Sequence, residues 1–336
     1  MKKILSLALA ALLVLSVFAG CGDKKGTDSG SSSGASSKQG ADVRIAGVKS
    51  PAGISLAKLM KDSGDKKTAN QYTATLYGDA ATAAEKLSAG EVDIAVLPTD
   101  VAAALYAQNS GSVQLLAANV LGALTVVDTT GEIKNLYGLM GQTVYAAGQG
   151  TTSEYLLNYV LDHSGLTVGT DVRIEYVDSY DQLVDMVADG RAPLAVMPEP
   201  YLSSALAKNG SAKAAVDLGG EWDRVSDGKE LLLGAAVART DFVKENGQAV
   251  KDFLQDFQNS VEFAAGNTEE TAALAQKYDI MKAEIAERAI PNLGIAYRDG
   301  ESMKASVSSL LQILFEANAQ SVGGSLPGDD FYYAKA

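Results

Sequence analysis

The chain has 336 residues, a formal net charge of −13, one cysteine and one histidine. One residue of each type excludes a His/Cys metal site, a Ser–His–Asp triad and a Cys–His pair, and we expect no metal and no cofactor. The acidic balance, without a basic patch, argues against nucleic-acid binding. The length is sufficient for two lobes of ordinary size.

The first 20 residues have the pattern of a secretion signal. A basic start, Met1-Lys2-Lys3, precedes an apolar run and the small residues Ala19-Gly20 before Cys21. The sequence VFAGC resembles a bacterial lipobox, which implies cleavage before Cys21 and lipidation of that cysteine. An uncleaved membrane anchor or a buried thiol is the alternative, but the apolar run is short for a spanning helix.

Residues 21–41 consist almost entirely of Gly, Ser, Lys and Asp, which is typical of a flexible tether. Globular sequence starts near Val43, and no later segment is long and apolar enough to cross a membrane. We therefore expect a body held at the extracytoplasmic face of the cell membrane, as on a Gram-positive cell surface, by a lipid anchor on Cys21.

The chain repeats itself at a spacing of 100 residues. GEVDIAVLPTD from Gly90 aligns with GRAPLAVMPEP from Gly190, and VRIAGVKSPAGISLAKLM from Val43 aligns with TVYAAGQGTTSEYLLNYV from Thr143. Each copy alternates strand and helix patterns, which is typical of α/β units with a parallel sheet. The expected strands are 43–48, 72–77, 92–98, 143–148, 172–177 and 193–198, and the expected helices are 54–64, 80–90, 154–165 and 181–190.

Two β-rich segments, 113–130 and 231–240, can carry the chain from one lobe to the other and back, and a helical region follows from Thr240 to Phe315. The expected fold class is α/β with two lobes, each a mainly parallel sheet flanked by helices, and two hinge crossings. The expected division is 42–125 for the first part of lobe 1, 126–228 for an inserted lobe 2, and 229–336 for the return to lobe 1 with C-terminal helices.

Candidate site residues follow the strands of both copies. Parallel sheets bind ligands beyond the carboxyl ends of their strands, where loops meet helix N-termini. We expect ligand contacts from Ser50, Gly78, Asp79 and Thr99 in the first copy and from Gln149, Thr151, Thr152, Ser153, Tyr180, Glu199 and Tyr201 in the second.

Several of these positions have a second interpretation. The hydroxyls of the GQGTTS loop at 148–153 can contact a ligand or cap the following helix, and the loop lacks the lysine of a phosphate loop. Glu199, between two prolines, can receive an amine, an aminopyrimidine or a hydroxyl, or it can be an exposed turn residue. Tyr180 and Tyr201 can stack on a ligand ring or pack in the core. Lys49 is the one cation on these loops, and the ligand's charge stays open.

The chain resembles the solute-binding lipoproteins of ABC importers, and among them the nitrate/sulfonate/taurine and thiamine-precursor (NitT/TauT-type) group. The matching stretches are AAEKLSAGEVDIAVLP, AAGQGTTSEYLLNYVLDHSGL, MPEPYL, TDFVKENGQAVKDFLQDF, NTEETAALAQKYD and LPGDDFYY. The resemblance implies the two-lobed periplasmic-binding-protein type II fold, hinge closure over a ligand, and delivery to a membrane permease driven by a separate ATPase. Met197-Pro198 stands where relatives often have Trp, so the resemblance does not settle the ligand.

These observations together predict a monomeric extracytoplasmic binding protein that captures a small molecule and delivers it to an ABC importer. The ligand classes within the group are anions, sulfonates, aromatic acids and aminopyrimidine-like compounds. An enzyme on the same fold, of the pyrimidine- or tetrapyrrole-synthesis type, is one alternative, although such enzymes need reactive His or Cys groups. A ligand-sensing surface lipoprotein without an importer is the other.

Overall fold

The computed structural model describes residues 40–334 except 110 and 123. The expected secretion signal, Cys21 and nearly all of the expected tether lie outside these residues. Among the helices of the described part, none is long and apolar enough to cross a bilayer.

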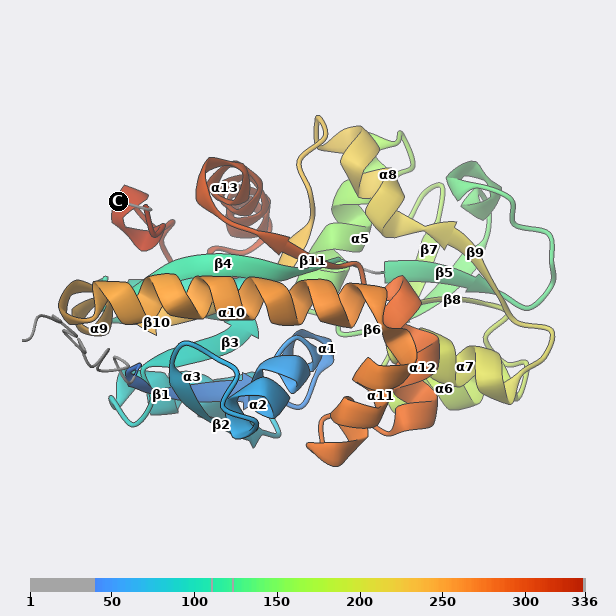
Figure 1. Cartoon of the computed structure of the whole chain (residues 1–336). Helices are drawn as coiled ribbons and strands as arrows, with labels where there is room; N and C mark the ends of the chain where they lie inside the picture. Colours follow the sequence, from blue (N-terminus) through green and yellow to red (C-terminus); the bar gives the residue numbers. More distant parts are fainter. Residues whose placement is uncertain (1–39, 110, 123, 335–336) are drawn as a thin grey trace, which may run out of the picture. The chain divides into compact units, whose positions relative to one another are not determined.

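Two β-sheets, each with its own helices, form two lobes (Figure 1). The sheet of the first lobe has the strand order β11-β4-β10-β3-β1-β2, and the sheet of the second has the order β7-β6-β8-β5-β9. The strands of the first sheet are β1 (Asp42–Val48), β2 (Gln71–Tyr77), β3 (Ile94–Pro98), β4 (Val113–Leu121), β10 (Leu232–Arg239) and β11 (Ile295–Arg298). Those of the second are β5 (Leu124–Asp128), β6 (Thr143–Ala147), β7 (Arg173–Val177), β8 (Leu194–Pro198) and β9 (Lys213–Asp217).

The expected α/β fold with two lobes is confirmed, and each sheet is mixed, with most of its strands running in one direction. β1 pairs in parallel with β2 and β3, and β6 pairs in parallel with β7 and β8. β10 and β5 run antiparallel to their neighbours. These two strands enter their sheets directly from the other lobe, so no helical crossover holds them parallel to the rest.

The 100-residue repeat has a counterpart in space. β4, β3, β1 and β2 occupy the same places in the first sheet that β9, β8, β6 and β7 occupy in the second, and the incoming strands β10 and β5 fill the remaining equivalent place. Gly234 of β10 pairs with Pro98 as Leu124 of β5 pairs with Pro198. The chain passes from the first sheet to the second between Leu121 and Leu124 and returns between β9 and β10. In each sheet, this place is therefore filled by the strand that follows a crossing from the other lobe.

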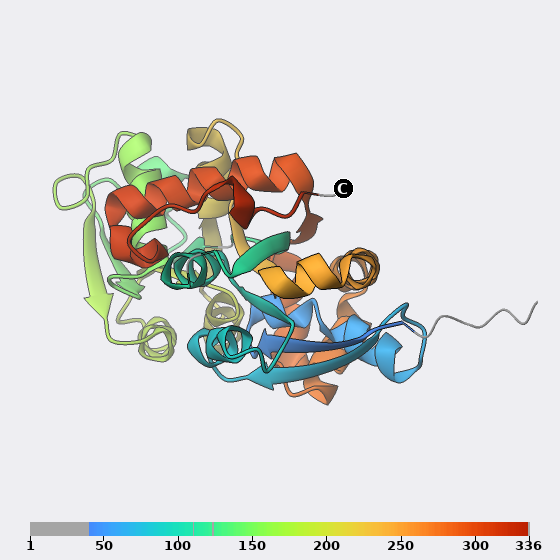
Figure 2. The same ribbon diagram turned by 90° about the vertical axis from the view of Figure 1, so that its left-hand side faces the viewer.

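Helices cover both faces of the first sheet. Phe253 and Phe257 of α10 pack with Ile45 and Leu116 in one apolar cluster, and burying a side chain of this size contributes about 1.5–3 kcal/mol. α3, α4 and α13 pack on the opposite face, and Figure 2 shows α13, in red, running from the first lobe toward α5 of the second. The α-helices of the first lobe are α1 (Pro51–Ile54), α2 (Ala57–Gly64), α3 (Ala80–Ser88), α4 (Thr99–Gln108), α9 (Thr240–Glu245), α10 (Gly247–Gly266), α11 (Thr268–Lys277), α12 (Ala283–Ala289) and α13 (Gly300–Ala317).

The described helices of the second lobe are all shorter than α10 and α13. They are α5 (Thr152–His163), α6 (Tyr180–Ala188), α7 (Tyr201–Lys208) and α8 (Leu218–Val225). Trp222 of α8 is fully buried, and its Nε1 donates a hydrogen bond to the carbonyl of Lys229, so it belongs to the core. Short 3-10 turns complete the structure at η1 (Leu136–Leu139), η2 (Ile290–Asn292), η3 (Ala319–Val322) and η4 (Asp329–Phe331).

Two segments differ from the sequence prediction. The expected loop at 49–53 contains the short helix α1, with Pro51 at its first position, where proline's missing N–H costs nothing. β11 interrupts the region predicted to be helical. Pro291 ends the preceding helix pattern, and Gly294, at φ +60°, turns the chain into an edge strand beside β4.

Candidate functional site

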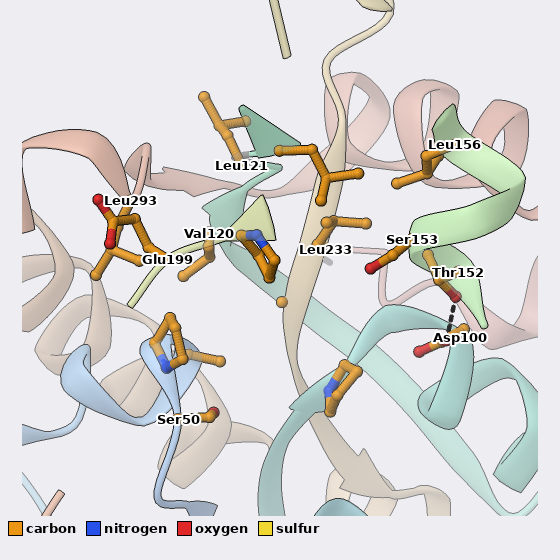
Figure 3. Close-up of a pocket in the computed structure, with 16 residues that line it drawn as sticks. Ser50, Asp100, Val120, Leu121, Thr152, Ser153, Leu156, Glu199, Leu233 and Leu293 are labelled. Atoms are coloured by element: carbon orange, nitrogen blue, oxygen red, sulfur yellow. Dashed lines mark hydrogen bonds between the residues drawn. The ribbon is translucent and has the colours of Figure 1, made fainter. Parts of the chain in front are cut away.

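A cavity of about 260 Å³ lies between the two lobes, at the carboxyl ends of β1, β3 and β8 (Figure 3). The first lobe contributes Ser50, Pro51, Ala52, Pro98, Asp100, Val120, Leu121, Leu233, Gly234 and Leu293 to its wall. The second contributes Leu124, Thr152, Ser153, Leu156, Pro198 and Glu199. The wall is mostly hydrocarbon, with two carboxylates and three hydroxyls as its polar side chains, which is the usual composition of a small-molecule pocket.

Asp100 is the carboxylate of the first lobe. It lies in the first turn of α4, where Oδ1 accepts a hydrogen bond from the backbone N–H of Val101 at 2.8 Å. Its Oδ2 accepts a hydrogen bond from the hydroxyl of Thr152 at 2.5 Å, which joins the two lobes across the cavity (Figure 3). Asp100 is half-buried and directs its carboxylate toward the central space, as Ser50 and Ser153 direct their hydroxyls.

Glu199 is the carboxylate of the second lobe, and it is 4% exposed. Ser203 of α7 donates to it twice, from the hydroxyl to Oε1 at 2.9 Å and from the backbone N–H to Oε2 at 3.1 Å. The side-chain amide of Asn292, on η2 of the first lobe, donates to Oε1 at 2.9 Å. The carboxylate therefore sits at one end of the cavity and forms a second link between the lobes.

Four of the predicted site residues line the cavity: Ser50, Thr152, Ser153 and Glu199. Tyr180 is not among the residues that line the cavity, and its ring stacks on Tyr201 with 4.8 Å between centroids. Burial raises the pKa of the Tyr180 phenol, so it stays protonated at neutral pH.

The remaining predicted site residues lie away from the cavity wall. Thr99 is buried, and its hydroxyl donates to the carbonyl of Leu232 at 2.8 Å. Asp79, which follows Gly78, is exposed and caps α3 by accepting from the N–H of Thr82 at 2.8 Å, an interaction that lowers the pKa of the Asp79 carboxyl. The exposed Thr151 donates its hydroxyl to the carbonyl of Gly148 at 2.6 Å, and Gln149 beside it is exposed. A ligand contact from these residues stays a prediction.

Sequence reasoning did not single out the residues that the crossing strands bring to the site. Leu121 and Leu124 flank one crossing, and Leu233 and Gly234 begin the returning strand β10. The apolar pattern of these residues predicts a strand, but it does not distinguish residues that line a cavity from residues that pack in the core. Asn292 was also missed, since its role depends on Glu199, which is 93 residues away in the chain.

The charges of the wall decide which ligand groups the cavity tolerates. A unit charge about 5 Å from a carboxylate interacts with it by about 3 kcal/mol at an effective dielectric constant of about 20. The N-termini of α4 and α5, which favour anions, contribute about 0.3–2 kcal/mol each. The two carboxylates outweigh the helix termini, so the arrangement favours a neutral or positively charged group over an anion.

Comparisons with known proteins give one family and one fold. The family model described as "Menaquinone biosynthesis" matches residues 58–316. A search of the curated proteins finds no match.

Three solved structures illustrate the likeness in fold. An ABC transporter from Parabacteroides distasonis has a TM-score of 0.73 at 23% identity, covering 88% of this chain and 99% of that one. The periplasmic aliphatic sulphonate binding protein SsuA from Escherichia coli has a TM-score of 0.67 at 18% identity, covering 88% and 92%. The periplasmic nitrate-binding protein NrtA from Synechocystis PCC 6803 has a TM-score of 0.53 at 16% identity, covering 84% of each chain. The resemblance to NitT/TauT-type binding proteins thus holds at the level of the fold.

Proposed function

The chain belongs to the family described as "Menaquinone biosynthesis" and has the fold of ABC-importer binding proteins, and from these two premises we propose that it is an extracytoplasmic, lipid-anchored solute-binding protein. It captures a small molecule between its lobes and delivers it to an ABC permease. The observation that carries the proposal is a cavity whose wall is shared by both lobes and closed by hydrogen bonds between them.

Closure between lobes gives such a cavity its function. A ligand that touches both lobes favours the closed form in proportion to its differential affinity for the closed and open states. The links from Thr152 to Asp100 and from Asn292 to Glu199 form only when the lobes approach, so ligand binding and lobe closure are coupled. A permease that distinguishes closed from open protein would then receive only loaded protein.

An enzyme is the second candidate, because the matched family is described by a biosynthetic pathway. Two carboxylates at a cavity can act as general acid and base if a substrate places a proton within about 2.6–3.2 Å of one of them. In this case Asp100 and Glu199 would exchange protons with the substrate, and a conservative amide at either position would abolish turnover.

One experiment separates the two candidates. The purified protein without its first 20 residues is screened by thermal shift against alkylsulfonates, nitrate, bicarbonate, aminopyrimidines, riboflavin, aromatic acids and aliphatic amines. A ligand at 100 times its Kd stabilises the fold by about 2.7 kcal/mol and raises Tm. Each compound that raises Tm is incubated with the protein and analysed by mass spectrometry. Recovery of unchanged compound at one per protein supports a binding protein, whereas product formation that Glu199→Gln abolishes supports an enzyme.

The lipid anchor is tested separately, at Cys21. We expect Cys21→Ala to prevent lipidation and to move the protein from the membrane fraction to the soluble fraction of cells that export lipoproteins, because a lipid chain is what holds the chain at the bilayer. Incorporation of labelled palmitate is the direct measurement, and Ser29→Ala in the tether is the control. Membrane retention of Cys21→Ala would show that the N-terminal segment itself is the anchor.

A further inference from the structure

The cavity wall carries two carboxylates that no Lys or Arg of the described part neutralises. Asp100 and Glu199 are its two charged residues, and neither forms an ion pair with a described Lys or Arg. Lys49, which precedes the wall residue Ser50, forms an ion pair with Asp279. A carboxylate in a mostly apolar wall is costly unless a cation or several hydrogen-bond donors compensate it.

The two carboxylates differ in how many further hydrogen bonds they can accept. Glu199 already receives three hydrogen bonds, from the side chain and backbone of Ser203 and from Asn292. Asp100 receives two, from Val101 and Thr152, and an ionised carboxylate offers about four acceptor positions. Asp100 is therefore the carboxylate with capacity for a ligand, and Figure 3 shows it facing the central space with the hydroxyls of Ser50 and Ser153.

A buried amide adds an independent acceptor at the same wall. Asn119 is completely buried, and its Nδ2 donates to the carbonyl of Ala52 and to the hydroxyl of Ser55, both at 2.9 Å, while its Oδ1 has no partner within the described residues. A Cβ added to Gly234, a residue of the cavity wall, would lie 2.7 Å from this oxygen. The unpartnered oxygen lies directly behind the wall, where its partial negative charge adds to that of the carboxylates.

Resting on the binding role proposed above, we propose that the ligand is a small organic cation that carries N–H donors, a protonated primary or secondary amine on a compact hydrocarbon body. The ammonium group donates to Asp100, with Ser50 and Ser153 as neighbours. The body lies against leucines of both lobes, among them Leu124, Leu156 and Leu233.

The wall also separates this class from two others. Quaternary ammonium groups are held by cages of aromatic rings, and no aromatic side chain lines the described cavity. Oxyanions such as sulfonates and carboxylates need fixed cations or several free donors, whereas the only side-chain donors of the described wall are hydroxyls, and two carboxylates lie beside them.

Matched compounds test the assignment. Butyl, cyclohexyl and benzyl bodies are each measured by isothermal titration calorimetry with an ammonium, a trimethylammonium, a hydroxyl and a sulfonate head group. We expect the ammonium member to bind most tightly within each body that binds, and at least about tenfold more tightly than the sulfonate. Asp100→Asn should weaken ammonium binding by at least about thirtyfold and leave alcohol binding within about threefold. Asp181→Asn is the matched control, since Asp181 holds the same second position in its helix, is exposed and lies outside the cavity.

Each outcome of these measurements either supports or overturns the assignment of an amine ligand. A sulfonate that binds as tightly as the amine of the same body, an ammonium preference that persists in Asp100→Asn, or no amine binding up to millimolar concentration would overturn the assignment. Tight binding of a sulfonate that is recovered unchanged would support the solute-binding role but contradict the assignment of a cationic ligand. Conversion of an amine to a product would contradict the solute-binding role but support the assignment of a cationic ligand.

Discussion

Gly234 occupies a place in β10 where the cavity wall has no room for a side chain. A Cβ there would lie 2.7 Å from Asn119 Oδ1, 3.2 Å from the Cβ of Val120 and 3.3 Å from the Cβ of Ala52. We expect Gly234→Ala to lower the free energy of unfolding by about 1–3 kcal/mol, because the crowded neighbours must shift. Urea unfolding measures the loss, and thermal shift with any ligand found in the screen measures the effect on binding.

Gly78→Ala is the control for this prediction, and it also tests a residue that the sequence predicts to be in the site. A Cβ at Gly78 meets nothing within 4 Å, so stability should change by less than about 1 kcal/mol. Equal losses for the two variants would contradict the crowding at Gly234. Loss of ligand binding in Gly78→Ala, without loss of stability, would place Gly78 in the site.

Asp93 ties two arginines to the first sheet and makes stability depend on pH. It accepts hydrogen bonds from Arg44 at 2.6 and 3.0 Å and from Arg239 at 3.2 Å. Burial alone raises the pKa of Asp93, but the hydrogen bonds and charges of the arginines outweigh it, and the pKa is lowered. A lowered folded-state pKa stabilises the fold above the unfolded-state value of about 3.9, and this contribution is lost as the pH falls through the folded-state pKa.

Asp93→Asn should therefore cost about 1–3 kcal/mol of unfolding free energy at pH 7. The difference from the parent protein should shrink as the pH falls below the unfolded-state value and vanish once the pH has fallen through the lowered folded-state pKa of Asp93. Urea midpoints at pH 7 and pH 3 are the measurement, with the exposed Asp189→Asn as control. A difference that grows on acidification would contradict the sign of the pKa shift.

Individual residues show where sequence reasoning succeeds and where it stops. Glu199 could be predicted at the site because prolines flank it after a buried strand, yet its three hydrogen bonds come from Ser203 and Asn292, which no local pattern identifies. Thr99, at the equivalent place in the first copy, instead donates to Leu232 of the returning strand. In each case the hydrogen-bond partner that determines the role of the residue lies on an element that only the tertiary structure places next to it.

Among the elements, the turn after α3 recurs after α6, and the two copies make a matched test. Gly90 and Gly190 both have φ +72°, and their N–H groups donate to Leu87 and Val187, respectively. An alanine in this left-handed conformation costs about 1–2 kcal/mol, so both Gly→Ala variants should be destabilised by that amount in urea. Gly90→Ala should cost slightly more, because its Cβ would lie 2.9 Å from Nη1 of Arg239, which Asp93 holds.

Gly247→Ala is the control for these two variants. Gly247 is at the start of α10, has no left-handed φ, and a Cβ there meets nothing within 4 Å. Its substitution should be neutral or stabilising by up to about 1 kcal/mol. A neutral Gly190→Ala would show that the second copy does not need the left-handed turn of the first.

Elements whose apolar residues recur with a clear period could be predicted from the sequence. Elements whose conformation depends on tertiary contacts could not. The strands and helices of both copies lie within a few residues of the expected ranges, because alternation and helical spacing are local properties. β11 was predicted as helix, since four residues between helices carry no clear period, and pairing with β4 decides their conformation. The antiparallel direction of β5 and β10 likewise depends on the exchange of strands between lobes.

On the scale of the whole molecule, three side-chain hydrogen bonds among the described residues link the two lobes away from the crossings. Thr152 donates to Asp100, Asn292 donates to Glu199, and the side-chain amide of Asn318 donates to the hydroxyl of Tyr155 at 2.9 Å. The first two flank the cavity, and both end on a carboxylate, which makes them stronger than neutral hydrogen bonds. Hydrogen bonds to charged groups contribute about 1.5–3 kcal/mol each, so the closed form without ligand depends strongly on them.

The double variant Thr152→Val/Asn292→Ala tests this dependence. Loss of both links should lower the ratio of closed to open protein by at least about tenfold, since about 1.4 kcal/mol corresponds to that factor. Small-angle X-ray scattering of the unliganded protein should then show a larger radius of gyration. Ligand affinity should fall in proportion to the closed fraction, because binding must also close the lobes.

The matched control is Thr240→Val/Asn267→Ala, which removes the same side-chain groups where both hydrogen bonds lie within the first lobe. Scattering of this control should superimpose on that of the parent. If the test variant scatters like the parent as well, the packing of α13 against α5 and of α12 against α7 holds the lobes together without the hydrogen bonds. The carboxylates would then keep a single role, toward the ligand, and Asp100→Asn would change binding without changing the unliganded shape.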